Sequence, residues 1–438
     1  MLKSIFKDIK SSGGKAYIVG GYVRDKILNV ESKDVDIEVY GITPQELKNI
    51  LQNYGRFRLV GKSYPIYLLE DYEFSFPHKT EVGVKGEHYK VDPKMTIEEA
   101  CARRDLTINS MLYDPLKDEI IDIYGGQEDI KKGILRYISP ESFQADPLRI
   151  LRVAQFKARF DFQVDEETEQ LCEKLIPTLE KIAKERIFIE IEKIMLKAKY
   201  PSIAFRWMKK IGILSSYFSE IDDLSQIEQG EKYHPEGDVF EHTMLSLNVL
   251  SISERDIILM LAILYHDIGK AYVKRIKKVD RVHFYGHENE GAKRVGFFLT
   301  KITDNKEIIS QVRALIKYHM RPLDLKNNLS KKAVRKLVNQ VDIPRLLKLH
   351  KADTLGRKVT TDISYIDDIL KVYNHVKDEV EPIIKGRHLI ELGVKPGKKM
   401  GKILKEIYDA QLNGEFSNLE EGLEYSNYIL KKIIFDDL

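Results

Sequence analysis

The sequence YIVGGYVRDKILNVESKDVDIEVY, residues 17–40, decides the fold of the first part of the chain. Its apolar first residues predict a buried strand, which the glycine pair Gly20 and Gly21 then breaks. A helix is predicted to start directly after the glycines, over residues 22–28. Residues 34–39 then alternate strictly between acidic and apolar side chains, which predicts a second strand with one face on the core.

The glycine pair and the two aspartates indicate a nucleotide site. Glycines between a strand end and a helix start let a phosphate approach the backbone, with helix N–H groups pointing at it. Asp34 and Asp36 project to the same side of a strand, with Cα atoms about 7 Å apart, and this suits carboxylates that share two divalent ions about 4 Å apart. An isolated Asp-x-Asp is more often the solvated face of a strand, but the upstream glycines favour nucleotidyl transfer.

Composition narrows the class of protein. The 438 residues are enough for two or three domains. A net charge of +3 means that any nucleic-acid surface depends on local clustering of Lys and Arg. Two cysteines give no disulfide framework, and no apolar run approaches a membrane span of about 18 residues. We therefore expect a cytoplasmic protein without a membrane partner.

The periodicity predicts an α+β fold: a small mixed-sheet domain, then helical domains. Residues 77–93 show little periodicity and are predicted to form a mobile loop. Thr96, with Glu99 three residues later, predicts the N-cap of a helix that carries residues 102–109. Further strands are predicted over residues 59–69, 72–76, 111–113 and 119–122.

Two residues further along are candidates for reading a base. Asp146 is predicted to cap a helix with Pro147 in its first turn, which places Arg149 on the same helix face. An acidic group accepts from the exocyclic amine of C or A, and an arginine donates to the neighbouring ring nitrogen or carbonyl. The pair is therefore suited to a base edge, while simple helix capping is the alternative role for Asp146.

The motifs GGYVRD, DVDIEVYG, RRDLTINS, ADPLRILRVAQFKARF and ERIFIEIEK, in this order, resemble the bacterial tRNA nucleotidyltransferase (CCA-adding enzyme) and poly(A) polymerase family, class II. The resemblance spans roughly the first half of the chain. It implies that Asp34 and Asp36 are catalytic and bind Mg²⁺ in a head domain, and that Asp146 and Arg149 in a neck select CTP and then ATP. The nucleotide-binding residues implied by it are Gly20, Gly21, Arg24, Arg103, Arg104, Asp105, Asn109, Asp146, Arg149 and Arg152. Ala145 departs from the acidic residue that the family often has there, and Glu73 is either a further metal ligand or a solvated strand residue.

A second set of candidate ligands lies downstream. Residues 256–265 predict an apolar helix that delivers His266 and Asp267. Imidazoles and carboxylates that converge from several helices are what a hydrolytic divalent site needs. The order of these residues resembles the HD phosphohydrolase superfamily, which implies a divalent transition metal of open identity and a phosphatase or phosphodiesterase activity, by analogy on 2′,3′-cyclic phosphates at RNA ends. The ligands implied by this resemblance are His242, His266, Asp267 and Asp353, with His287 and His319 as in two-metal members.

These observations predict four domains: a nucleotidyltransferase head (1–138), a helical neck and RNA-binding region (139–230), an HD domain (231–360) and a helical, tRNA-contacting C-terminal region (361–438). The expected function is template-independent addition of C and A to tRNA 3′ ends from CTP and ATP. An A-adding enzyme or poly(A) polymerase is one alternative, and an HD phosphohydrolase whose head only binds RNA is another. Clustered lysines between residues 395 and 405 favour contact with the tRNA backbone over an ordinary solvated face. The sequence indicates no protein partner.

Overall fold

The computed structural model describes residues 1–31, 35–61, 65–83, 86–230, 234–278, 281–357, 359 and 361–436. The chain forms two compact units. The N-terminal unit comprises Met1–Ile194 and Ile203–Tyr217, and the C-terminal unit comprises Met195–Ser202 and Phe218–Leu438. Within the described ranges, every helix is too short or too polar to cross a membrane.

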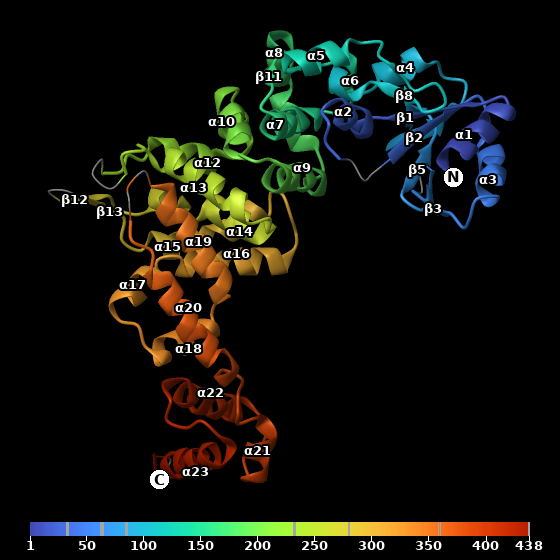
Figure 1. Ribbon diagram of the computed structural model, residues 1–438. Helices are drawn as coiled ribbons and strands as arrows, with labels where there is room; N and C mark the ends of the chain where they lie inside the picture. Colours follow the sequence, from blue (N-terminus) through green and yellow to red (C-terminus); the bar gives the residue numbers. More distant parts are fainter. Residues whose placement is uncertain are drawn as a thin grey trace. The chain divides into compact units, whose positions relative to one another are not determined.

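The N-terminal unit begins with mixed strands and helices and continues with helices, as the predicted α+β class requires (Figure 1). Its elements are α1 (Leu2–Ser11), β1 (Lys15–Val19), α2 (Gly21–Ile27), β2 (Val35–Tyr40), α3 (Pro44–Gln52), β3 (Arg58–Val60), β4 (Ile66–Leu69), β5 (Tyr72–Ser75), β6 (His78–Gly83), β7 (Gly86–Val91), α4 (Ile97–Ala102), η1 (Thr107–Asn109), β8 (Leu112–Asp114), β9 (Glu119–Ile121), α5 (Gly126–Lys132), β10 (Ile134–Leu135), α6 (Pro140–Ala145), α7 (Arg149–Phe160), β11 (Gln163–Val164), α8 (Glu166–Leu175), η2 (Ile176–Lys181), α9 (Lys184–Lys197), α10 (Ser202–Lys210) and α11 (Ile213–Tyr217).

A seven-stranded sheet with the order β3-β4-β5-β2-β1-β8-β9 forms the centre of the head. Strand β2 pairs antiparallel with β1 and parallel with β5, so it lies in the middle of the sheet. Ile37 and Val39 of β2 are buried in the core that α1 and α3 cover, while Asp36 and Glu38 project from the opposite face. The predicted alternation therefore decides which face of β2 carries the carboxylates.

Three predictions for this unit are wrong in detail. Residues 77–93 are not a loop: β6 and β7 pair antiparallel as a separate two-stranded sheet. The helix capped by Thr96 ends at Ala102, so Arg103 and the residues that follow lie in a turn that leads into η1. The single strand expected over residues 59–69 is two antiparallel strands, β3 and β4.

The helix expected to start at Asp146 also starts elsewhere. Asp146 follows the last residue of α6 with extended backbone (φ −140°, ψ 87°), and α7 begins at Arg149 with Leu148 as its N-cap. Asp146 is therefore not an N-cap, and it does not share a face of α7 with Arg149. The residue before a proline is disfavoured in helical conformation, and Pro147 thus interrupts the chain between the two helices.

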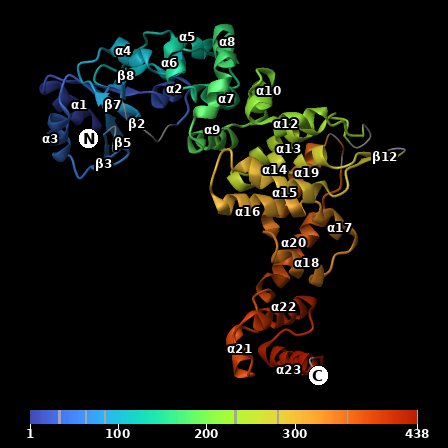
Figure 2. The ribbon, with the colours of Figure 1, turned by 180° about the vertical axis from the view of Figure 1, so that it is seen from behind.

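The C-terminal unit is almost entirely helical (Figure 2). Its elements are α12 (Ser219–Asp222), η3 (Asp223–Gln226), α13 (Val239–Ser253), α14 (Ile257–Tyr265), η4 (Ile268–Tyr272), β12 (Ile276–Lys278), β13 (Arg281–His283), α15 (His287–Leu299), α16 (Lys306–Tyr318), α17 (Arg321–Asn327), α18 (Lys331–Val338), α19 (Ile343–Gly356), α20 (Tyr365–Val376), η5 (Lys377–Glu379), α21 (Gly386–Glu391), α22 (Lys398–Asn413) and α23 (Leu419–Asp436). Helices α21, α22 and α23 share a small apolar core that includes Leu389, Ile403 and Ile429.

Gly126 sets the position of η1, which belongs to the predicted nucleotide site. A Cβ atom at Gly126 would lie 2.3 Å from the carbonyl oxygen of Thr107. We therefore expect Gly126→Ala to destabilise the head by about 1–3 kcal/mol, the range for overpacking, as a lower transition temperature in scanning calorimetry. Gly401→Ala, in α22, is the matched control: no atom lies within 4 Å of its added Cβ, so its transition should stay or rise. Equal effects of the two variants would contradict the packing argument.

Candidate functional site

The turn between β1 and α2 brings three predicted residues together. Gly20 has a left-handed φ of 68° and is the N-cap of α2, a conformation that glycine adopts without strain. A Cβ atom at Gly20 would lie 3.6 Å from Nη1 of Arg104 and 3.9 Å from Oδ2 of Asp36. Gly21 opens α2 beside this position. A glycine turn, a carboxylate and a guanidinium thus meet where the central strand β1 ends and β2 begins.

Glu73 lies beside Asp36. In the parallel pairing of β2 with β5, Asp36 stands opposite Glu73, and paired residues on neighbouring strands project to the same face about 4.8 Å apart. Both residues are exposed. Asp34, the other predicted metal ligand, lies outside the described residues.

Arg104 is held in place by its surroundings. Its Nη2 donates to Oε2 of Glu38 at 3.2 Å, and its Nη1 donates to the carbonyl oxygen of Asn109 at 3.3 Å. The hydroxyl of Tyr40 donates to the same oxygen of Glu38 at 2.6 Å. Burial lowers the pKa of Arg104, but the charge of Glu38, together with nearby Cys101 and Tyr40 and the hydrogen bond to Glu38, outweighs burial and raises the pKa. Arg104 is therefore a fixed cation, while the neighbouring Arg103 follows the end of α4.

Asp105 is buried and tied to α7. Its Oδ2 accepts from Nε of Arg152 at 2.6 Å, and its Oδ1 accepts from the backbone N–H of Leu106 and from Nδ2 of Asn109. Burial raises the pKa of Asp105, but the charge of Arg152 and these hydrogen bonds lower it to about 2. Asp105 is therefore an ionised anchor for the segment that carries the two arginines, rather than an open acceptor.

Arg24 is also buried, at 3% exposure. It donates to Oδ1 of Asn109 and to Asp25, and its guanidinium lies 5.1 and 4.9 Å from the ring centres of Phe156 and Phe160 on α7. Two separate contacts, one from Arg24 and one from Arg152, thus fasten the nucleotide site of the head to the same helix.

The predicted base-reading pair is positioned by long-range contacts. Arg149 donates to the carbonyl oxygens of Arg104 at 2.8 Å and Arg103 at 2.5 Å. Asp146 accepts from Nη2 of Arg186 on α9 at 2.8 Å. The side chains thus come from different elements, and Arg186, which the resemblance places in a separate motif, orients the carboxylate.

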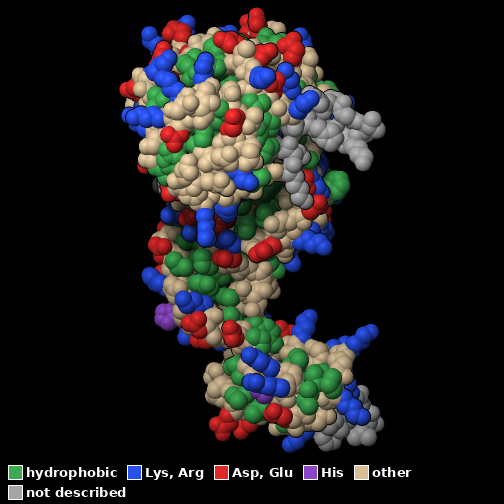
Figure 3. All heavy atoms as spheres, turned by 90° about the vertical axis from the view of Figure 1, so that its right-hand side faces the viewer, with side chains coloured by type: hydrophobic (Ala, Val, Ile, Leu, Met, Phe, Trp, Pro, Cys, Tyr) green, Lys and Arg blue, Asp and Glu red, His purple; other side chains and the backbone are tan. Residues whose placement is uncertain are grey.

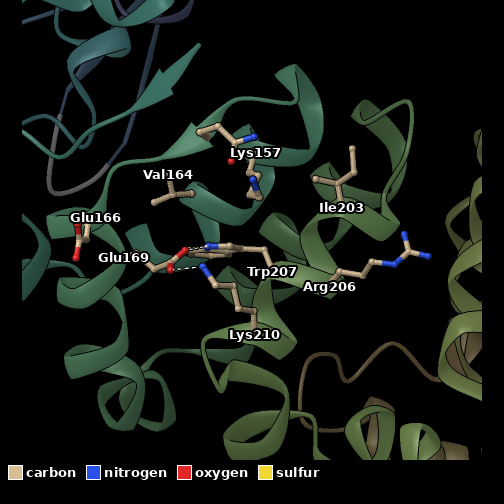
Figure 4. A pocket seen from close by; sticks show the side chains of 9 residues that line it. Lys157, Val164, Glu166, Glu169, Ile203, Arg206, Trp207 and Lys210 are labelled. Carbon is tan, nitrogen blue, oxygen red and sulfur yellow. Dashed lines mark hydrogen bonds and ion pairs between the residues drawn. The ribbon is translucent and has the colours of Figure 1, made fainter. Parts of the chain in front are cut away.

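A pocket of about 690 Å³ lies between α7, α8 and α10 (Figure 4). Glu169 crosses it and accepts from Nε1 of Trp207 and from Nζ of Lys210. Lys157 and Arg206 also line it. Because Glu169 neutralises Lys210, the remaining cations give this pocket a weakly basic character.

The second site lies in the C-terminal unit, where α13, α14, α15, α16 and α19 come together (Figures 1 and 2). All six predicted ligands lie there and are at most 8% exposed. Helix α13 carries His242, His266 and Asp267 follow α14, His287 begins α15, His319 follows α16, and α19 carries Asp353. The structure brings these side chains together: five of them lie in overlapping groups, and Asp353 lies 3.0 Å from His242. Their role as metal ligands stays a prediction.

Asp267 stands at the centre of the cluster. Its Oδ2 lies 3.3 Å from Nε2 of His266 and 3.9 Å from Nε2 of His242. Its Oδ1 lies 3.3 Å from Nε2 of His287 and 3.9 Å from Nε2 of His319. Asp353 adds an oxygen 3.0 Å from Nε2 of His242. The two oxygens of Asp267 therefore face two separate pairs of histidines.

The histidine tautomers fit a cation. Nδ1 of His266, His287 and His319 each lies 2.7 Å from a backbone carbonyl oxygen, so Nδ1 carries the proton and Nε2 the lone pair. Nε2 of His287 and His319 are 3.2 Å apart, and within the described residues Nε2 of His266 has no hydrogen-bond partner. Burial, with His287 and His266 nearby, lowers the pKa of His319 to about 3. Converging Nε2 atoms on buried imidazoles are a donor set for a divalent ion.

Three polar residues of this site were missed by the sequence analysis. Glu236 contacts His242, His234 contacts Glu236, and Arg357 donates to both oxygens of Asp353 at 3.2 Å. The stretch HPEGDVFEH contained the signal for the first two, since it places a histidine and a glutamate just before His242.

Three known families match successive parts of the chain. The family model described as "Poly A polymerase head domain" matches residues 16–136, and "Probable RNA and SrmB-binding site of polymerase A" matches residues 161–224, which include most of the pocket residues. A model of tRNA nucleotidyltransferase domain 2 matches residues 288–425.

Relatives in sequence and similar solved structures are both named as CCA proteins or CCA-adding enzymes. The chain is 35% identical to the Multifunctional CCA protein of Haemophilus influenzae over 84% of this chain and 92% of that protein, and 34% identical to that of Pasteurella multocida over 80% and 86%. The fold is similar to the Bacillus stearothermophilus CCA-adding enzyme in complex with CTP, with a TM-score of 0.70, 20% identity and coverage of 98% and 97%. It is also similar to the Thermotoga maritima CCA-adding enzyme complexed with tRNA, with a TM-score of 0.57, 23% identity and coverage of 98% and 94%.

The fold and the two sites define a nucleotidyltransferase that carries a second, histidine-rich centre. Its head has the glycine turn, β2 carboxylate and anchored arginine of a nucleotidyl-transfer site, and its C-terminal unit has the separate His/Asp cluster. The chain belongs to the class II CCA-adding enzyme and poly(A) polymerase family, with the multifunctional CCA proteins as its relatives.

The ion pair between Asp105 and Arg152 gives a prediction about stability. Arg152→Met leaves a buried carboxylate unpaired and should cost about 3–5 kcal/mol at pH 7. The native pKa of about 2 is depressed, so the pair stabilises above the unfolded pKa and is lost as pH falls from about 4 towards 2. In the variant the unpaired carboxyl takes up a proton at higher pH, so the difference from wild type should shrink on acidification.

Thermal unfolding at pH 7 and pH 5 measures this difference. The double variant Asp105→Asn/Arg152→Met should recover part of the lost stability and depend less on pH. Lys132→Met removes an exposed pair with Glu128 and should change stability by less than about 1 kcal/mol. Strict additivity of the two single substitutions would contradict the coupling.

Proposed function

We propose that this chain adds C and A nucleotides to tRNA 3′ ends from CTP and ATP. The observation that carries the proposal is that Gly20, Asp36 and Arg104 come together where the central strand β1 ends and β2 begins. It puts a backbone turn open to phosphate, a carboxylate and a fixed cation within reach of one triphosphate.

The head residues fit Mg²⁺, which prefers carboxylate oxygens and substrate phosphates. We propose Asp36 and Asp34 as its ligands, with Glu73 as a third carboxylate because it pairs with Asp36 in register. When bound, two such ions supply activation of the RNA 3′-hydroxyl and neutralisation of the leaving pyrophosphate.

The remaining residues bind and orient the nucleotide. Arg103 and Arg104 contact the triphosphate, and Asp105 with Asn109 holds the segment that presents them. Arg149 and Asp146 read the base edge, with Arg149 braced on the carbonyl oxygens of the two arginines and Asp146 braced on Arg186. These contacts link base recognition to the position of the triphosphate, so a correctly held base aligns the reacting phosphate.

The second centre is proposed to be a metal-dependent phosphatase or phosphodiesterase, with 2′,3′-cyclic phosphates as the substrate class. His242, His266 and Asp353 would hold one divalent transition metal and His287 and His319 another, with Asp267 shared. When bound, the pair supplies a hydroxide nucleophile at neutral pH. Lys270, whose Nζ lies 2.6 Å from Oδ2 of Asp267, is placed beside the centre to contact a phosphate.

We assign tRNA backbone contact to the C-terminal helices and place the enzyme in the cytoplasm, where tRNA is processed. Gly397 is the N-cap of α22, and five lysines lie just before this helix or in its first half: Lys395, Lys398, Lys399, Lys402 and Lys405. Basic and acidic side chains are interspersed on the face that Figure 3 presents, so contact with RNA depends on such local groups rather than on net charge.

Nucleotide addition is tested with tRNAs that end before CCA, after C and after CC, each with labelled CTP or ATP. Asp36→Ala should lower the single-turnover rate at least about 10³-fold, because metal clamping contributes several kcal/mol and each 1.36 kcal/mol is tenfold. Glu119→Ala, on the edge strand β9, is the control and should extend all three tRNAs normally.

The pattern of tRNA extension distinguishes the proposed function from its two alternatives. Addition of C and then A to all three tRNAs supports the proposal. Extension of the CC-ending tRNA alone identifies an A-adding enzyme. If wild type extends none of them yet hydrolyses phosphodiesters, the head only binds RNA.

Removal of metal tests the second centre. Stripping the chain with a chelator should abolish hydrolysis of 2′,3′-cyclic AMP, and Mn²⁺, Co²⁺, Ni²⁺ or Zn²⁺ should restore it. His266→Ala should lower hydrolysis at least about 10²-fold, since a ligand is lost, while CCA addition with Mg²⁺ continues at the wild-type rate. His375→Ala, an exposed histidine on α20, is the control. Hydrolysis that survives both treatments would refute the assignment.

A further inference from the structure

The four histidines of the metal centre are held in two different ways. His266, His287 and His319 each direct Nδ1 to the carbonyl oxygen of the residue three positions earlier, Ile263, Phe284 and Ile316, at 2.7 Å. Nδ1 of His242 instead lies 3.0 Å from Oε1 of Glu236. His242 lies inside α13, where backbone carbonyls are occupied by helical hydrogen bonds, so its ring needs a side chain for this purpose.

The chain before α13 delivers Glu236 to that position. A turn closes between His234 and Gly237, where the N–H of Gly237 donates to the carbonyl oxygen of His234 at 3.1 Å. Gly237 has a φ of 113°, a left-handed conformation that favours glycine. Asp238 then caps α13 by accepting from the N–H of Glu241. The turn places the Glu236 side chain under the first turn of the helix, where it is fully buried.

The carboxylate of Glu236 contacts two imidazole rings. Its Oε1 lies 2.8 Å from Nδ1 of His234 and 3.0 Å from Nδ1 of His242. A buried carboxylate that accepts from an imidazole N–H fixes the tautomer and makes the opposite nitrogen a stronger ligand.

We propose that Glu236 is a positioning residue of the metal centre, which fixes His242 with Nε2 directed at the metal. This inference rests on the metal centre proposed above. Glu236 contacts Nδ1, whereas Asp353 and Asp267 face Nε2, at 3.0 and 3.9 Å. The two nitrogens point away from each other across the ring, so Glu236 lies on the far side of His242 from the metal. Glu236 therefore orients a ligand and is not one.

The test measures metal binding by the full-length, metal-stripped chain with Mn²⁺ and Zn²⁺ in isothermal titration calorimetry. Glu236→Ala should weaken binding about 10–100-fold, the usual cost of removing such a partner, without changing the number of ions bound. Glu236→Gln keeps an oxygen acceptor but loses the charge, so its loss should be smaller. Glu228→Gln, a glutamate 81% exposed in an ion pair with Arg275, is the matched control and should bind as wild type does.

A second readout needs neither metal nor activity. Long-range ¹H–¹⁵N spectra of the histidine-labelled, metal-free chain should show His242 protonated on Nδ1 in wild type and a mixture of tautomers in Glu236→Ala. If that variant misfolds, the isosteric Glu236→Gln carries the test. CCA addition should be unchanged in every variant.

The outcomes are separable. Affinity within about twofold of wild type in Glu236→Ala, with wild type binding metal, overturns this inference alone. Loss of one bound ion per chain makes Glu236 a direct ligand and also overturns it. Absence of metal binding by wild type overturns the proposed metal centre and this inference together.

Discussion

The ion pair between Arg152 and Asp105 is the constraint on which the nucleotide site depends. It connects helix α7 to the short segment that presents Arg103 and Arg104. Asp105 also accepts hydrogen bonds from Asn109 and from the backbone N–H of Leu106, so the whole segment is held in place. Because each partner is buried or half-buried, the pair remains strong where an exposed ion pair would contribute little. The segment that presents the two arginines is thus supported by α7, and loss of the Arg152 charge would leave the buried carboxylate of Asp105 without its ion-pair partner.

The second centre also depends on the rule that a buried charge needs a partner, but it meets that rule with different groups. Its acidic groups are ionised and buried, and each is balanced: Asp353 by Arg357, and Asp267 by His266 and Lys270. The histidine rings are oriented by acceptors on Nδ1, so that Nε2 of each ring points inward. The head uses exposed carboxylates, which suit hard Mg²⁺, while this centre uses buried imidazoles, which suit transition metals. The two proposed metal sites therefore differ in donor type.

The sequence predicted the fold correctly where neighbouring residues alone determine the local structure. The glycine pair and the alternation of residues 34–39 identified β1, α2 and β2, and Thr96 with Glu99 formed the expected capping box. The prediction failed where long-range contacts decide. Strands β6 and β7 pair with each other in a sheet of their own rather than with the central sheet. Asp146 has a good capping composition, but Pro147 breaks the helix and Arg186, forty residues away, takes the carboxylate.

The histidine cluster shows the same division between local and long-range information. Which residues come together could be inferred from their types and order, because a metal site needs particular donors. How they are oriented could not, since three rings depend on backbone carbonyls that every helix possesses. Only His242 depends on a side chain, and that side chain is delivered by a glycine turn six residues upstream. An inward-pointing lone pair without a cation leaves a buried polar atom unsatisfied, as at His266. An ion bound there as proposed would satisfy this atom, so metal would stabilise the folded unit and its binding would be coupled to folding.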